Sequence, residues 1–200
     1  MTVTSPIYRS PRLYEATMTA LYGRHYQARY SALASLIPAG ASVVELCCGP
    51  GTLYRRALRA KQVHYTGLDI SPVFIDAVRA AGGDGRLWDV RMPHSLPVGQ
   101  YLLIQASLYH FIHEGASELV DRMLAAAERE VIIAEPIRNL TTGRMPLSKR
   151  LGSLTNPGTG AQPHRYTAET LDRLIDPYRH RLRDAFLLPG GREQAYVLAA

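Results

Sequence analysis

The fold of this chain is decided by the stretch Val43-Val44-Glu45-Leu46-Cys47-Cys48-Gly49-Pro50-Gly51-Thr52-Leu53. β-Branched residues lead into an acid, two glycines follow, and a run compatible with a helix begins near Thr52. This order predicts a strand, a tight turn and a helix start, as in a nucleotide-type site. Glycine lets the backbone approach a ligand, and a helix start offers unpaired N–H groups to an anion.

A second acid strengthens this interpretation, because a glycine loop alone is also an ordinary β–α turn. Residues 64–69 form another strand-like run, which ends in Asp69. A carboxylate at the tip of the second strand is placed to accept hydrogen bonds from both hydroxyls of a ribose. The two stretches together predict a ribose-containing ligand at one edge of a sheet.

Length and composition suit one soluble globular domain. The chain has 200 residues, of which 46% are hydrophobic and 20% charged. No apolar run reaches the roughly 18 residues of a membrane span, and the first residues lack the pattern of a signal peptide. We therefore expect a cytoplasmic protein without a membrane partner.

Charge and cysteine content narrow the class of partner. The formal net charge is +6, but the basic residues are mostly dispersed arginines, so a solvated basic surface is favoured over a nucleic-acid partner. Cys47 and Cys48 are the only cysteines. Adjacent cysteines rarely pair, so we expect reduced thiols. The histidines lack metal-ligand spacing, and no metal site is predicted.

The N-terminal part is expected to be helical. Residues 11–37 show helical periodicity, and residues 1–40 are interpreted as a helical cap before an α/β domain at 41–200. Tyr22, Tyr26 and Tyr30 share one helix face at a spacing of four. Burial against a core is the favoured explanation; the alternative is that their hydroxyls, with His25, close the top of the cofactor site.

Strands and helices alternate in the rest of the chain. Strands are predicted at 42–47, 64–69, 85–88, 101–105, 131–135, 181–188 and 193–198, and helices at 52–61, 71–82, 117–129 and 167–177. Residues 136–166, rich in proline and glycine, interrupt this rhythm. A connection of this length is usually functional or disordered, and we expect a lid over an acceptor site.

Together these features resemble the class I S-adenosylmethionine-dependent methyltransferases, in particular those that act on small molecules. The resemblance covers about residues 40–200. It implies a Rossmann-like α/β fold with a seven-stranded mixed sheet in the order 3-2-1-4-5-7-6, strand 7 antiparallel, and helices on both faces. It also implies S-adenosyl-L-methionine as cofactor and a small-molecule acceptor.

The resemblance also implies site residues. The family pattern acid-x-Gly-x-Gly-x-Gly reads here as Glu45, Cys47, Gly49 and Gly51, with Cys47 in place of the first glycine. The implied roles of the acids and their neighbours are as follows: Glu45 anchors the methionine amino group, Asp69 binds the ribose, Ile70 packs on adenine, Asp89 and the Val90 N–H contact the adenine edge, and Gln105 flanks the methionine moiety.

The segment 105–111 should lie beside the transferred methyl group, because it follows the fourth strand. His110 is the candidate general base, since imidazole titrates near neutral pH. Tyr109 and His113 are the alternatives, and a purely structural histidine competes with all three. The expected reaction is an in-line displacement, in which positioning supplies most of the catalysis.

Three other functions remain open or are disfavoured. A non-catalytic cofactor-binding scaffold and a nucleic-acid methyltransferase both stay open. No Asn-Pro-Pro-Tyr or Asp-Pro-Pro-Tyr sequence is present, which argues against the amino-methylating nucleic-acid branch. A nicotinamide dinucleotide site needs a third glycine where this chain has Tyr54.

Overall fold

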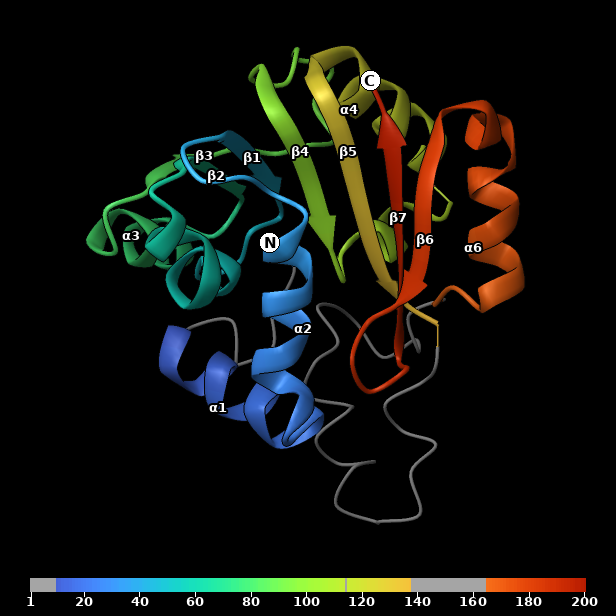
Figure 1. Ribbon diagram of the computed structural model, residues 1–200. Coiled ribbons are helices and arrows are strands. Elements are labelled where there is room, and N and C mark those ends of the chain that lie inside the picture. The colour runs from blue at the N-terminus through green and yellow to red at the C-terminus, as the bar shows by residue number, and fades with distance from the viewer. Residues whose placement is uncertain (1–9, 114, 138–164) are drawn as a thin grey trace.

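The computed structural model describes residues 10–113, 115–137 and 165–200. One sheet of seven strands runs in the order β3-β2-β1-β4-β5-β7-β6, which confirms the predicted order (Figure 1). Neighbouring strands are parallel except that β7 is antiparallel to β5 and β6. The strands are β1 (Ser42–Leu46), β2 (His64–Asp69), β3 (Asp84–Leu87), β4 (Gly99–Gln105), β5 (Ala127–Pro136), β6 (Leu182–Leu187) and β7 (Glu193–Ala199).

Both faces of the sheet are covered by helices. The central strands are apolar on both sides, as is usual for a parallel sheet between two helical layers. One core contains side chains of α1 (Pro11–Tyr22), α2 (His25–Ser35) and α3 (Pro72–Ala80). The other contains side chains of α4 (Ala116–Ala126) and α6 (Ala168–Ile175). In Figure 1, α2 lies in front of the sheet and α4 behind it.

The prediction of one helix over 11–37 is wrong, because two helices occupy this range. Gly23 adopts φ 53°, a conformation that favours glycine, and its N–H donates to the Thr19 carbonyl and ends α1. The chain then turns and begins α2 at His25. Both helices contribute to the same core as the sheet.

Two other helices differ in detail from the prediction. The helix after the glycine loop contains a π-helical turn at Tyr54–Leu58 and a 3₁₀ turn at Arg59–Lys61. The helix predicted for 117–129 ends at Ala126, because residues from Ala127 onward pair with β4 and β7. Pairing to two strands outweighs the helix propensity of this segment.

The predicted N-cap residues precede their helices, but only one of them makes the capping hydrogen bond. Ser71 precedes α3 without a capping bond from its side chain. Thr167 caps α6, and Thr170 completes the capping box in place of the usual Glu. Short 3₁₀ turns at Leu108–Phe111 and Asp176–Arg181 complete the described elements.

The carboxyl ends of β1 to β5 meet at one edge of the sheet. The chain runs from β1 outward to β3 and then returns to place β4 on the other side of β1. Ligands of open α/β sheets bind at such a reversal, outside the carboxyl ends of the strands. Most of the lid expected at 136–166 lies outside the described residues. Within them, no helix combines the length and apolar character needed to cross a membrane.

Candidate functional site

The glycine loop follows β1 and contains three residues with positive φ. Cys47, Gly49 and Gly51 have φ of 51°, 56° and 66°. A residue with a side chain in this region is strained by roughly 1–2 kcal/mol. Cys47 thus keeps the left-handed conformation that glycine would favour at the first position of the pattern. Its cofactor contact stays a prediction.

The two loop glycines are required for different reasons. A Cβ atom on Gly51 would lie 2.8 Å from Val78 Cγ2 in α3, so a side chain there would collide with the core. A Cβ atom on Gly49 would meet nothing within 4 Å. Gly49 therefore faces open space that a ligand can enter, whereas Gly51 allows the loop to pack on α3.

Asp69 ends β2 beside this loop and holds its backbone. The Gly49 N–H donates to Oδ2 at 2.9 Å, and the Ser71 N–H donates to Oδ1 at 2.8 Å. Burial raises the pKa of Asp69, and these N–H groups oppose the shift. A carboxylate offers about four lone-pair sites, so Asp69 can hold the loop and still accept hydrogen bonds from a ligand.

The remaining residues predicted for the adenosine end lie along the same edge. Ile70 follows a buried strand yet is 59% exposed, so it presents apolar surface to solvent. Arg91 donates to both oxygens of Asp89, at 2.9 and 2.7 Å, and lowers its pKa. A ligand amino group would therefore share Asp89 with Arg91. Val90 is buried, and its carbonyl accepts from Arg122 Nη1 at 2.6 Å.

Glu45 is buried in β1 on the face covered by α2. Its Oε2 accepts from the Tyr65 hydroxyl at 2.6 Å. Burial raises the pKa of Glu45 to about 8; the Tyr65 bond lowers it, and the charge of Asp69 raises it further. Most of this acid is therefore protonated at neutral pH, and a cationic ligand group nearby would favour its charged form.

A buried ion pair joins the N-terminal helices to the same edge. Glu193 begins β7 and is 1% exposed. Its Oε1 accepts from the Tyr22 hydroxyl at 2.7 Å and from Arg29 Nη2 at 2.5 Å. Its Oε2 accepts from Arg29 Nε at 2.9 Å and from Gln105 Nε2 at 3.3 Å. The Arg29 guanidinium also lies 3.9 Å from the centroid of the Tyr22 ring.

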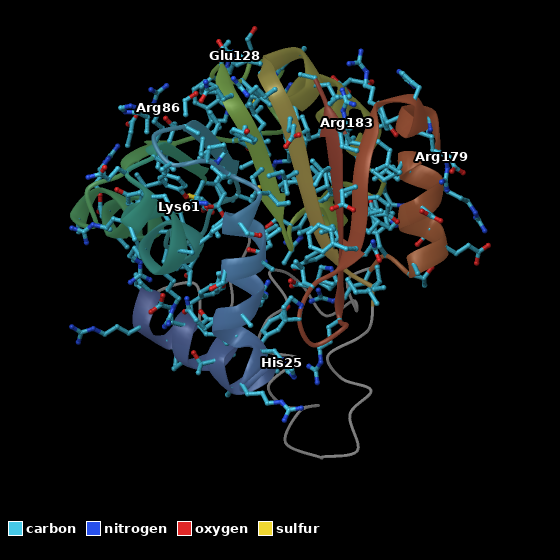
Figure 2. The ribbon with its side chains drawn as sticks, viewed as in Figure 1. His25, Lys61, Arg86, Glu128, Arg179 and Arg183 are labelled. Carbon is cyan, nitrogen blue, oxygen red and sulfur yellow. The ribbon has the colours of Figure 1, made fainter. Side chains whose placement is uncertain are left out.

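The tyrosine stripe is buried, as the favoured interpretation expects, and its closing of a cofactor site stays a prediction. Tyr22, Tyr26 and Tyr30 are all buried in the core beneath α2. Tyr22 also directs its hydroxyl to the carboxyl edge through Glu193. His25 lies instead at the periphery, against the turn at Gly190 between β6 and β7 (Figure 2).

On the opposite face, Glu135 near the end of β5 is fully buried. Its Oε1 accepts from the N–H groups of Ser107 at 2.7 Å and Leu108 at 2.6 Å, so it clamps the segment that follows β4. Its Oε2 has no hydrogen-bond partner among the described residues. Burial raises the pKa of Glu135 to about 8, while the two N–H groups lower it.

The candidate catalytic residues lie on the clamped segment. The rings of Tyr109 and His110 are 4.0 Å apart, and the Arg165 guanidinium lies 4.4 Å from the Tyr109 centroid. Partial burial and the charge of Arg165 lower the pKa of His110 to about 4. Burial raises the pKa of Tyr109 to about 12, so at neutral pH His110 is neutral and Tyr109 is protonated. His113 is exposed.

The structure brings most of the predicted residues to one edge but adds three that the sequence analysis did not select. Glu135 could have been found, because an acid that follows an apolar strand is the same signal that identified Asp69. Arg29 and Glu193 carry no such signal, since 164 residues separate them. The pairing of β7 with β5 places Glu193, and the packing of α2 on the sheet places Arg29 beside it.

The described residues also form a surface hollow away from this site, but they form no metal site. A hollow of about 380 Å³ is lined by residues such as Ser42, His64 and Asp84 at the amino ends of the strands, away from the glycine loop. No group of three His, Cys, Asp or Glu side chains in the described ranges could hold a metal ion.

Comparison with known proteins identifies the architecture. No family model matches the chain, and no curated protein matches its sequence. Magnesium protoporphyrin IX methyltransferase from Synechocystis PCC 6803, with bound S-adenosylhomocysteine, matches with a TM-score of 0.64 and 14% identity. The match covers 96% of this chain and 95% of that chain. The chain has the class I methyltransferase fold.

Two further solved structures match this chain over most of its length. The plantazolicin methyltransferase BpumL, also with S-adenosylhomocysteine, has a TM-score of 0.66 at 12% identity, with 96% of this chain and 92% of that chain covered. The pyocyanin biosynthetic protein PhzM has a TM-score of 0.66 at 20% identity, with 96% of this chain but 60% of that chain covered. At these identities the likeness establishes the methyltransferase fold of this chain and not its reaction.

Proposed function

We propose that this protein is an S-adenosylmethionine-dependent methyltransferase that acts on a small-molecule acceptor. The observation that carries the proposal is the arrangement of Asp69, Gly49 and Ile70 at the point where the sheet reverses. Asp69 has lone pairs left for ribose hydroxyls, Gly49 leaves open space, and Ile70 exposes apolar surface for a ring. Solved structures with this fold hold S-adenosylhomocysteine.

The residues present suit such a cofactor along its whole length. Asp69, Ile70 and Asp89 would hold the adenosine end over β2 and β3. Glu45, Cys47 and Gln105 would lie at the amino-acid end between β1 and β4. When bound, S-adenosylmethionine supplies a methyl group on a sulfonium, so the protein has to position an acceptor and needs a base only where the accepting atom loses a proton.

The segment after β4 would perform this task. His110 has a pKa of about 4 and is neutral at pH 7, so its lone pair is free to take a proton, but it is a weaker base than the ordinary imidazole for which it was selected. Tyr109 remains protonated and can donate a hydrogen bond, but it cannot act as the base at this pH. Arg165, over the Tyr109 ring, suits an acceptor that carries a negative group.

A nucleic-acid acceptor is disfavoured by the distribution of charge. Lys61, Arg86, Arg179 and Arg183 come from different elements and lie at separate places on the molecule (Figure 2). Several exposed arginines also pair locally with acids, such as Arg86 with Asp84. These four positions therefore do not form the single basic stripe that binding to a nucleic-acid backbone favours.

Calorimetry with S-adenosylhomocysteine tests the cofactor assignment. Asp69→Asn should weaken binding by roughly ten- to a hundredfold, because ribose hydroxyls would lose a charged acceptor. Asp84→Asn is the matched control, since Asp84 begins β3 at the other edge and pairs with Arg86. Equal losses in both variants, or no binding by the unaltered protein, would reject the proposal.

The acceptor class needs a second measurement. Labelled S-adenosylmethionine should be incubated with the protein and with fractions of a cell extract separated by size. Label in the small-molecule fraction supports the proposed reaction, whereas label only in RNA, DNA or protein contradicts it. Cofactor binding without transfer of label to any fraction would favour the scaffold alternative.

A further inference from the structure

The Gln105 side chain is held in one orientation by the chemistry of its partner. The Glu193 carboxylate accepts from Arg29 and from Tyr22, and it also accepts from Gln105 at 3.3 Å. A carboxylate has no hydrogen to donate, so Gln105 must present its NH₂ group to Glu193. The amide oxygen Oε1 therefore faces away from Glu193 and can only accept hydrogen bonds.

Gln105 lies where the sheet reverses direction. Leu46 of β1 pairs with Ile104 of β4, so Cys47 and Gln105 are neighbours at the carboxyl edge. Ile104 belongs to the core under α4, and the side chain of Gln105 points to the opposite face, where Glu193 and α2 lie. The backbone of Gln105 is thus adjacent to the glycine loop, at the end of the site remote from Asp89, while its NH₂ group is directed the other way, toward β7.

We propose that Glu193, held by Arg29 and Tyr22, is a positioning residue that turns the Gln105 amide oxygen toward the cofactor's ammonium group. The inference rests on the proposed function. The adenosine end is assigned to β2 and β3, so the amino-acid end lies over β1 and β4, beside Gln105. Gln105 Oε1 can only accept hydrogen bonds, so it favours a ligand group that donates them. The ammonium group is the strong donor at that end of the cofactor.

The alternative is that the ion pair only fastens α1 and α2 to the sheet. Removing two charges from water is costly, and apolar side chains can often replace such a pair without loss of stability. An apolar replacement of the pair therefore separates the two roles. It preserves packing while it releases Gln105.

The test compares two probes on the full chain by calorimetry. S-adenosylhomocysteine carries the amino-acid end, and methylthioadenosine has the same adenosine without it. The double variant Arg29→Met/Glu193→Leu should lose roughly ten- to a hundredfold in affinity for S-adenosylhomocysteine, the usual range for a hydrogen bond to a charged group. Its affinity for methylthioadenosine should be unchanged.

A single substitution gives an independent result if the double variant does not fold. Gln105→Leu should cause the same selective loss, and adding it to the double variant should cause no further loss, because both act on one contact. Gln100→Leu is the matched control, since Gln100 lies at the amino end of the same strand and accepts from the Ser42 N–H. It should leave both affinities unchanged.

Three outcomes would overturn the inference. Unaltered affinity for S-adenosylhomocysteine in Gln105→Leu would show that the amide contacts no ligand. Equal losses for both probes in the double variant, with Gln105→Leu unaffected, would assign Glu193 a purely structural role. If the unaltered protein bound neither probe, the proposed function would fail together with the inference.

Discussion

The two faces of the sheet each bury an acid at the carboxyl edge, and the two acids are treated differently. On the α2 face, both oxygens of Glu193 are paired with donors, among them a guanidinium. On the α4 face, one oxygen of Glu135 clamps two N–H groups and the other has no partner among the described residues. The two acids are equally buried, but the free-energy cost of keeping a charge there differs between them.

The two acids differ in how the negative charge of each affects the stability of the folded protein. Glu193 lies beside the buried Arg29: burial lowers the pKa of Arg29, but the Glu193 carboxylate outweighs this effect and raises it. Within residues 10–113, 115–137 and 165–200 no cation pairs with Glu135, and burial raises its pKa to about 8. Neutralising the two acids should therefore change stability in opposite directions.

The largest expected effect is that of Glu193→Gln. The substitution leaves Arg29 buried without a counter-charge, and we expect a loss of about 3–5 kcal/mol in the free energy of unfolding. Urea unfolding at pH 7 measures it. Glu169→Gln is the control, because the Glu169–Arg173 pair is exposed and its loss should cost less than about 1 kcal/mol. If both variants lost a similarly small free energy of unfolding, the buried pair would be no more important for stability than the exposed one.

The next effect has the opposite sign. The folded-state pKa of Glu135 is about 8, above the ordinary value of 4.5, so its contribution to stability is complete below pH 4.5 and is lost as pH rises to about 8. Glu135→Gln cannot ionise and should escape this loss. The variant should be more stable than the unaltered protein by about 3 kcal/mol at pH 7 and equal to it near pH 4.

Unfolding curves across this pH range test the prediction. Glu45 has a similarly raised pKa and remains in both proteins, so the difference between their curves isolates Glu135. A variant less stable than the unaltered protein at pH 8 would contradict the prediction, because Glu135 would then be charged and stabilised by its hydrogen bonds.

The contrast also shows how far the sequence could be interpreted. The strands and the acids at or near the ends of β1, β2 and β3 were predictable, because apolar runs and acids at strand ends are local signals. The sheet order was implied by the resemblance to a known family. The break at Gly23 was missed because helical periodicity continues through it, and one glycine decides the conformation. The environments of Glu135 and Glu193 depend on strands and helices distant in sequence, so no local pattern could distinguish them.

The smallest predicted effect concerns the segment that Glu135 clamps. Ala106 has φ 51°, a conformation that glycine adopts without strain, and it immediately precedes the two clamped N–H groups. Ala106→Gly should relieve roughly 1–2 kcal/mol of strain. Glycine also adds roughly 0.4–1 kcal/mol of unfolded-state entropy, so the net gain in stability should be about 0.5–1 kcal/mol.

A second alanine supplies the control for this prediction. Ala20 is exposed in the last turns of α1, where glycine should cost about 1 kcal/mol through lower helix propensity. The two substitutions should therefore shift the urea midpoint in opposite directions. If Ala106→Gly destabilises the protein as Ala20→Gly does, the segment after β4 is not held in the left-handed conformation. The Glu135 clamp would then not set the positions of Tyr109 and His110, and the two faces would differ only in charge.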